Sequence, residues 1–122
     1  MPLRISVVDD DESVRDSTKA LLRSAGYEVA TFESAETFLN SGVLTDTACL
    51  LVDIGMPGMS GFDLQRVVKT SNSAVPIVFI TAHDNPRNRR RALETGAVAF
   101  LSKPFAAPAL LDAVESAVQS QP

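Results

Sequence analysis

Five short apolar runs, rich in β-branched residues, alternate along this chain with segments whose apolar side chains recur at helical spacing. Each run is short and bounded by polar residues, as a buried strand is. The runs are Ile5–Val8, Tyr27–Phe32, Ala48–Val52, Val75–Ile80 and Ala99–Leu101. Strands that alternate with helices are joined by right-handed crossovers. The pattern therefore predicts an α/β fold, a doubly wound five-stranded parallel sheet with helices on both faces.

The segments between the runs carry signals that start and stop helices. Asp11 is interpreted as lying at the start of the first helix, where negative charge suits the helix dipole. The other predicted helix starts are Ser34, Ser60 with Asp63 as a capping box, Asn85 followed by Pro86, and Pro108. Gly26 and Gly96 are predicted helix stops. One helix is therefore expected after each strand.

The composition fits a single domain that spans residues 1–122, with 45% hydrophobic residues to supply its core. Residues 117–122 are small and polar, as in a fraying helix end or the start of a linker to an output domain. A net charge of −4 argues against nucleic-acid binding by this segment. The single cysteine, Cys49, lies in an apolar run and is expected to pack inertly. Neither a signal peptide nor a membrane span is evident, so we expect a cytoplasmic location without membrane contact.

Charged and hydroxyl side chains follow four of the predicted strands. Asp9 and Asp10 follow the first strand, Asp53 the third, Thr81 the fourth and Lys103 the fifth. With the strand order 2-1-3-4-5, ligands bind beyond the strand ends between the first and third strands. Carboxylates gathered there repel one another unless a cation such as Mg²⁺ neutralises them. A carboxylate can also be a nucleophile that forms an aspartyl phosphate, with neighbouring charges positioning the phosphoryl group.

Four sequence blocks, in order and at fitting separations, then resemble the receiver domain of bacterial two-component response regulators. The blocks are Val8–Asp11, Asp53–Gly61, Ile80–His83 and Lys103–Phe105. Three segments, Ser13–Arg15, Phe32–Ala35 and Thr81–His83, are most similar to the FixJ-like subgroup, which is usually joined to a LuxR-type DNA-binding domain. The resemblance implies the flavodoxin-like receiver fold and a signalling phosphoacceptor that is not a metabolic enzyme. Its phosphoryl donor would be a histidine kinase, and its output would be transcription.

The resemblance assigns the phosphoacceptor and metal roles residue by residue. Asp53 corresponds to the phosphoacceptor. Asp9, Asp10 and Asp53 correspond to the carboxylates that bind Mg²⁺ or Mn²⁺, and the backbone carbonyl of Gly55 to a further ligand. Gly55 departs from the family, which often carries a longer side chain there.

The remaining assigned roles concern the phosphoryl group and the response to it. Thr81 and Lys103 correspond to its hydroxyl and amine contacts. Thr81 and Phe100 correspond to a conformational switch, in which the aromatic ring turns inward. His83 and residue 55 correspond to the positions that flank the attacking water in dephosphorylation. The Lys103–Pro104 bond is often cis in the family.

Arg87, Arg89, Arg90 and Arg91 form a run on the predicted fourth helix. Two interpretations stay open. One is a solvated helix face. The other is a partner-docking surface, because family members form dimers or output contacts through the fourth helix, fifth strand and fifth helix. DNA contact is expected only through an output domain that this sequence lacks.

Three other functions are weighed against the receiver interpretation. A Mg²⁺-dependent aspartyl-phosphate phosphatase usually has a second catalytic aspartate two residues after the nucleophile, where this chain has Gly55, and a cap domain is missing. An FMN carrier of the same fold would need a phosphate-binding loop after the first strand, where three acids would repel the phosphate. A stand-alone receiver, or a phosphate sink without DNA-binding output, remains an alternative.

Overall fold

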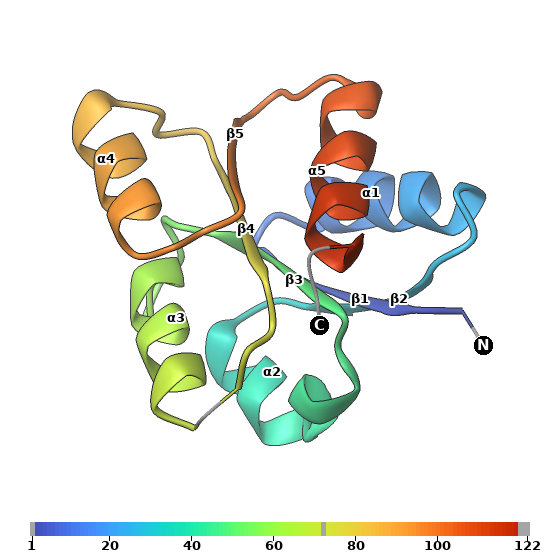
Figure 1. Ribbon diagram of the computed structural model, residues 1–122, viewed down its shortest axis with the longest axis horizontal. Coiled ribbons are helices and arrows are strands. Elements are labelled where there is room, and N and C mark those ends of the chain that lie inside the picture. The colour runs from blue at the N-terminus through green and yellow to red at the C-terminus, as the bar shows by residue number, and fades with distance from the viewer. Residues whose placement is uncertain (1, 72, 120–122) are drawn as a thin grey trace.

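The computed structural model describes residues 2–71 and 73–119. Its elements follow in strictly alternating order, with a short 3-10 helix, η1, inserted after α2 (Figure 1). The strands are β1 (Arg4–Val8), β2 (Glu28–Phe32), β3 (Cys49–Asp53), β4 (Ile77–Thr81) and β5 (Ala99–Ser102). The helices are α1 (Glu12–Ser24), α2 (Ala35–Ser41), η1 (Val43–Asp46), α3 (Gly61–Thr70), α4 (Pro86–Glu94) and α5 (Ala107–Gln119).

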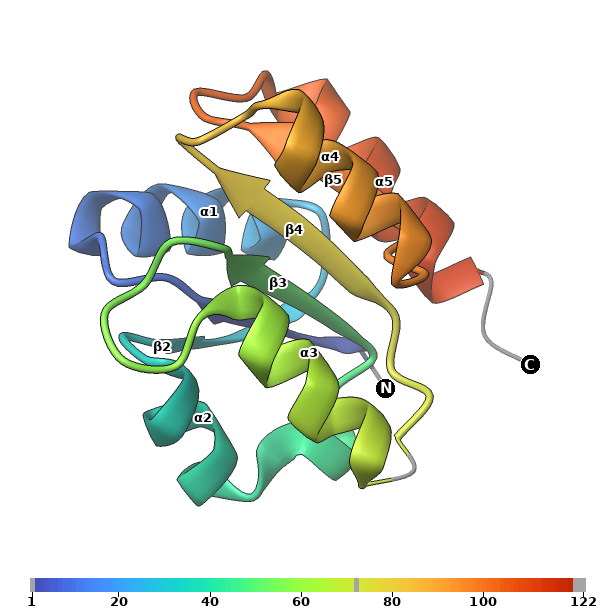
Figure 2. The same cartoon turned by 90° about the vertical axis from the view of Figure 1, so that its left-hand side faces the viewer.

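All five strands are parallel and lie in the order β2-β1-β3-β4-β5, so the predicted fold and strand order are confirmed. Helices α2, α3 and α4 pack on one face of the sheet, and α1 and α5 on the other (Figure 2). Alternate residues of β3 serve the two faces: Leu50 and Val52 join the first core, while Cys49 and Leu51 join the second. The central strand is buried on both sides, as its continuous apolar sequence predicts.

The two cores supply the apolar burial that stabilises the sheet. Phe38, Phe79 and Leu50 are fully buried in the first core, and Leu110 is fully buried in the second. A side chain of this size contributes about 1.5–3 kcal/mol when it leaves water. Cys49 is also fully buried, and burial raises the pKa of its thiol to about 12, which keeps it protonated and unreactive as predicted.

The predicted helix signals are confirmed, except for the start of the last helix. Asp11 caps α1, and its side chain accepts from the backbone amides of Ser13 and Val14. Ser34 and Asn85 cap α2 and α4, and Ser60 forms a complete capping box with Asp63 on α3. Gly26 follows α1 with φ of 95°, a left-handed conformation that glycine adopts without strain.

Several predicted boundaries differ from the structure for local reasons. β2 begins at Glu28 because the amide of Tyr27 still bonds the carbonyl of Leu22 at the end of α1. β4 begins at Ile77 because Pro76 has no amide proton to give to a strand ladder. The last helix begins one residue before the predicted Pro108. Helix η1 was not predicted.

Residues 117–119 belong to α5, while 120–122, the rest of the segment considered for a linker, lie outside the described residues. Among the residues that the structure describes, we find no helix of the length and apolar character that a bilayer span requires.

Candidate phosphoryl-transfer and metal site

Asp53 ends the fully buried strand β3 and is itself only 5% exposed. The amide that follows it, that of Ile54, donates to the carbonyl of Ile80 at 3.2 Å, which ties the strand end to β4. The amide of Gly55 donates to Asp53 Oδ1 at 3.1 Å and fixes the carboxylate. The strand end therefore presents one oriented carboxylate at the sheet edge.

Gly61, the first residue of α3, sets how closely that helix approaches the strand end. A Cβ there would lie 2.6 Å from the carbonyl oxygen of Asp53 and 3.0 Å from both Ile54 Cα and Val52 Cγ1. Its amide donates to the carbonyl of Ile54 at 3.1 Å. The backbone around the phosphoacceptor candidate is thus packed against a residue that must lack a side chain. This packing role of Gly61 was not predicted from the sequence, because only the fold brings α3 back against the end of β3.

Asp9 and Lys103 complete the buried part of the site. Asp9 is fully buried. Lys103 Nζ lies 2.7 Å from Asp9 Oδ2 and 3.2 Å from Asp53 Oδ2, so one ammonium joins the ends of β1 and β3. The amide of Lys103 donates to the carbonyl of Thr81 at 2.8 Å, and the Lys103–Pro104 bond is cis, as predicted.

The charges in this site influence one another. Burial raises the pKa of Asp9, and the contacts with Lys103 and with the amide of Asp11 only partly offset that rise. For Lys103, burial lowers the pKa, but the carboxylates of Asp9 and Asp53 outweigh burial and the net shift is upward. Lys103 therefore remains an ammonium at neutral pH.

The structure brings Asp9, Asp10 and Asp53 together as the sequence predicts. One carboxylate oxygen from each lies within 4.8 Å of the others; Asp10 is exposed and the other two are buried. The contact between Asp9 Oδ2 and Lys103 does not have hydrogen-bond alignment, so among residues 2–71 and 73–119 this buried oxygen lacks an aligned donor. Buried, clustered carboxylate oxygens with unused lone pairs are ligands that suit Mg²⁺ or Mn²⁺. Asp11 is not among them, because its carboxylate caps α1.

Thr81 ends β4 and is fully buried. Its hydroxyl accepts from the amide of His83 at 2.8 Å. The ring of His83 lies over Gly55, where a Cβ would be 3.1 Å from His83 Cδ2. The two residues predicted to flank the attacking water in dephosphorylation, Gly55 and His83, thus face each other across the β3 and β4 loops.

Phe100 on β5 is 7% exposed and belongs to the core that α4 covers. The guanidinium carbon of Arg89 lies 4.9 Å from its ring centroid. Arg89 also pairs with Asp84 at 2.8 Å, and Asp84 accepts a hydrogen bond from Ser102. This network links the loop after β4 to β5. Asp84 and Ser102 could not be predicted from the sequence, since their contact joins elements that only the fold brings together.

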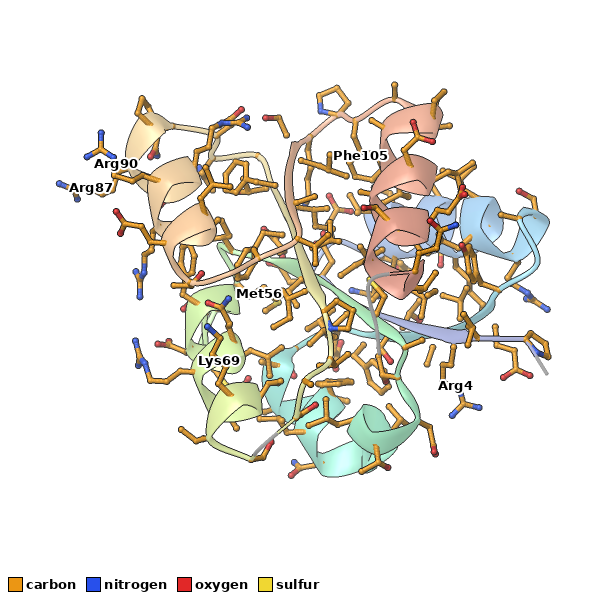
Figure 3. All side chains as sticks on the ribbon, in the orientation of Figure 1. Arg4, Met56, Lys69, Arg87, Arg90 and Phe105 are labelled. Atoms are coloured by element: carbon orange, nitrogen blue, oxygen red, sulfur yellow. The ribbon has the colours of Figure 1, made fainter. Side chains whose placement is uncertain are left out.

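The four arginines of α4 do not share one environment. Arg89 contacts Phe100, and Arg91 stacks on Phe62 of α3 with its guanidinium carbon 4.2 Å from the ring centroid. Arg87 and Arg90 project from α4 away from the body of the molecule (Figure 3). The run therefore divides between two aromatic contacts and an outward surface.

Comparison with known proteins places this site in a family. Residues 5–115 match the response regulator receiver domain family. Nodulation protein W of Bradyrhizobium diazoefficiens is 45% identical over 115 residues, and the transcriptional regulatory protein FixJ of that organism is 39% identical over 119. The solved structure of the response regulator StyR is 49% identical in sequence and superposes with a TM-score of 0.88. The match spans 95% of this chain and 59% of the StyR chain.

The chain belongs to the response regulator receiver domain family, a signalling family of two-component systems. The resemblance to FixJ-like receivers drawn from the sequence is confirmed. The match to nodulation protein W includes 94% of this chain but only 51% of that protein. The match to FixJ includes 97% of this chain and 58% of FixJ. It thus spans about half the length of the curated relatives it matches.

Proposed function

We propose that Asp53 accepts a phosphoryl group from a sensor histidine kinase in the cytoplasm, with Mg²⁺ bound by Asp9, Asp10 and Asp53. The observation that carries this proposal is the position of Lys103 Nζ, within 3.2 Å of Asp53 and 2.7 Å of Asp9. A buried nucleophilic carboxylate beside a fixed ammonium and two further acids matches what phosphoryl transfer requires, namely positioning and charge neutralisation.

In the proposed reaction an oxygen of Asp53 forms a bond to phosphorus as the N–P bond of a phosphohistidine breaks. The bonding electron pair leaves with the imidazole. Lys103 neutralises charge on the phosphoryl oxygens, and a divalent metal held by Asp9, Asp10 and Asp53 would supply further neutralisation. The amide of Gly55 donates a hydrogen bond to Asp53 Oδ1 at 3.1 Å and so orients the attacking carboxylate. Thr81 donates its hydroxyl once it turns from the His83 amide toward the phosphoryl group.

A cleft of about 450 Å³ beside the site gives the donor a place to approach. It lies between α1 and the segment after β5, and its lining is partly apolar. The lining residues are Asp11, Val14, Ser17, Ala82, Lys103, Pro104 and Phe105. Because Lys103 belongs to both the cleft and the site, a kinase segment seated here would deliver its phosphohistidine next to Asp53.

The consequence of phosphorylation is proposed to be a shift in α4 and β5. Thr81 and Phe100 would respond to the phosphoryl group, and the face of α4, β5 and α5 would bind a second copy or an output domain. The transcriptional regulators among the relatives support a DNA-binding output in a longer protein. The sensor kinase, the homodimer and the transcriptional output are all parts of this proposal.

The test is labelling with acetyl phosphate and Mg²⁺, followed by mass spectrometry of the intact chain. We expect one phosphoryl addition in the parent chain and in Asp16→Asn, whose acid is exposed on α1. Asp53→Asn should remove the label, and chelation of the metal should do so too. Equal labelling of Asp53→Asn would overturn the assignment of the phosphoacceptor. Labelling without any change in self-association or in α4 would leave a phosphate sink as the better description.

A further inference from the structure

Basic residues are concentrated on two adjacent helices of this acidic chain. The chain has 11 lysines and arginines and a net charge of −4. Six of the 11 lie on α3 and α4: Arg66, Lys69, Arg87, Arg89, Arg90 and Arg91. Arg89 is neutralised by Asp84. The other five are exposed and form a basic surface on these two helices.

A cleft of about 130 Å³ opens between α3 and α4 in the middle of this surface. Its lining consists of Phe62, Gln65, Arg66, Lys69, Arg91 and Thr95. Phe62 is 5% exposed and packs on Phe79, so it forms an apolar floor, while three cations stand at the rim. A cavity of about 150 Å³ is known to hold one benzene-sized group, so this cleft has room for one apolar side chain.

Hydrogen bonds between α3 and the end of α4 fix the shape of the cleft before a partner binds. The carbonyl of Thr95, at the C-terminal end of α4, accepts from Gln65 Nε2 at 3.3 Å and also from Lys69 Nζ. Gln65 is 4% exposed, so its contact is shielded from water. Arg91 is held over the Phe62 ring at 4.2 Å. A partner would therefore meet a preformed surface and would order few side chains on binding.

The cations at this surface have little neutralisation from the chain itself. Arg66 pairs with Asp63 at 3.5 Å, and both side chains are largely exposed. Within the described ranges 2–71 and 73–119, Lys69, Arg87, Arg90 and Arg91 have no carboxylate within ion-pair distance. Arg87 precedes Arg91 by one helical turn on the same side of α4. Weakly neutralised cations around an apolar cleft are complementary to carboxylates that flank an apolar side chain.

We propose that the α3–α4 cleft binds an acidic polypeptide segment of a partner protein. An apolar side chain of the segment enters the cleft beside the stacked Phe62 and Arg91 side chains. Aspartates or glutamates on either side of it pair with Arg66, Lys69 and Arg91. The net charge of −4 disfavours a nucleic acid as the occupant, since a phosphate backbone requires a broadly basic surface. None of the residues that line the cleft is Asp9, Asp53 or Lys103, so this binding does not depend on the phosphoacceptor assignment.

The test is fluorescence anisotropy with a dye-labelled peptide in which one leucine is flanked by aspartates and glutamates. Lys69→Glu/Arg91→Glu should weaken binding by about tenfold or more, because two attractive pairs become repulsive. The matched control is Lys19→Glu/Arg23→Glu on α1, which also takes the net charge from −4 to −8, each substitution contributing −2. We expect the control to lose no more than about twofold, an effect of long-range charge that salt screens.

Further variants of the chain and of the peptide separate the possible outcomes. Lys69→Gln/Arg91→Gln should give an intermediate loss and serves if the charge reversal unfolds the chain. A peptide with asparagine and glutamine in place of the acids, or with serine in place of leucine, should bind more weakly than the parent peptide. Every variant should still label at Asp53 with acetyl phosphate, which separates failure of this inference from failure of the proposed function.

Five results would overturn the proposal, four of them comparisons. These are equal loss in the α1 control, equal binding of the neutral peptide, tighter binding of a short DNA duplex through the same residues, and peptide-independent self-association through the cleft in sedimentation. Absence of any peptide binding by the parent chain at low salt would also overturn it.

Discussion

The crevice at the ends of β1 and β3 and the cleft between α3 and α4 both gather charges of one sign, but in opposite environments. In the crevice, Asp9 and Asp53 are buried and share the single ammonium of Lys103. In the cleft, Lys69 and Arg91 are exposed and are spread over a rim. Buried like charges interact strongly and depend on a counterion, whereas exposed ones are screened by water. Equivalent substitutions should therefore have much larger effects in the crevice.

The largest effect is expected from removal of the shared ammonium. Lys103→Met leaves two buried carboxylates without a cation and should lower the free energy of unfolding by about 3 kcal/mol. Lys69→Met, on the exposed rim, should cost no more than about 1 kcal/mol, the value of one hydrogen bond. Urea unfolding at neutral pH measures both. Mg²⁺ should restore part of the stability of Lys103→Met, and similar losses in the two variants would contradict the comparison.

The next effect concerns packing around the phosphoacceptor. Gly61→Ala places a methyl group 2.6 Å from the carbonyl oxygen of Asp53, a backbone atom that cannot move aside. The loss of stability should be roughly 1–3 kcal/mol, with slower labelling of Asp53 by acetyl phosphate. Gly55→Ala is the matched control, because its nearest neighbour is the side chain of His83 in an exposed loop. Its loss should stay within about 0.5 kcal/mol. Normal labelling of Gly61→Ala would show that Asp53 tolerates a shift of α3.

A smaller effect distinguishes the two regions by pH. Burial raises the pKa of Asp9, whereas bonds from the backbone and hydroxyl of Ser60 lower the pKa of Asp63 on α3. A carboxyl whose pKa falls on folding adds stability above its unfolded pKa near 4, and that stability is lost as the pH falls through the lower folded value. Asp63→Asn should therefore be less stable than the parent at pH 7, and the difference should vanish in acid.

Unfolding curves at neutral and acidic pH test the capping-box prediction. In the background of Ser60→Ala, which removes the hydroxyl partner, the pH-dependent loss from Asp63→Asn should shrink. A difference that grows in acid would reverse the sign and contradict the assignment.

The smallest effects are expected within the arginine run. Arg91→Gln removes a guanidinium stacked on Phe62 and should cost roughly 0.5–1 kcal/mol. Arg87→Gln removes an outward-projecting side chain and should change stability by no more than about 0.5 kcal/mol. Thermal or urea unfolding of the two variants side by side measures the difference. Equal values would mean that the ring contact adds nothing in water.

Much of the site could be predicted from the sequence because its residues lie at strand ends. Parallel strands end at one edge of a sheet, so Asp9, Asp53 and Lys103 had to converge once the strand order was given. The capping residues Asp11, Ser60 and Asn85 were predictable for a related reason, since their partners lie within three residues. Boundaries such as that of β2 were not, because the amide of Tyr27 could serve either the helix or the strand.

The sequence by itself determined the class of fold, the helix signals and the residues of the acidic site, since each depends on local pattern or on strand order. Only the tertiary structure decided which arginine meets which ring, why residue 61 lacks a side chain, and how Asp84 reaches Ser102. These contacts join residues from different elements, and their distances depend on how the helices pack on the sheet. Periodicity fixes the face of a helix that is buried, but packing fixes the neighbour it finds there.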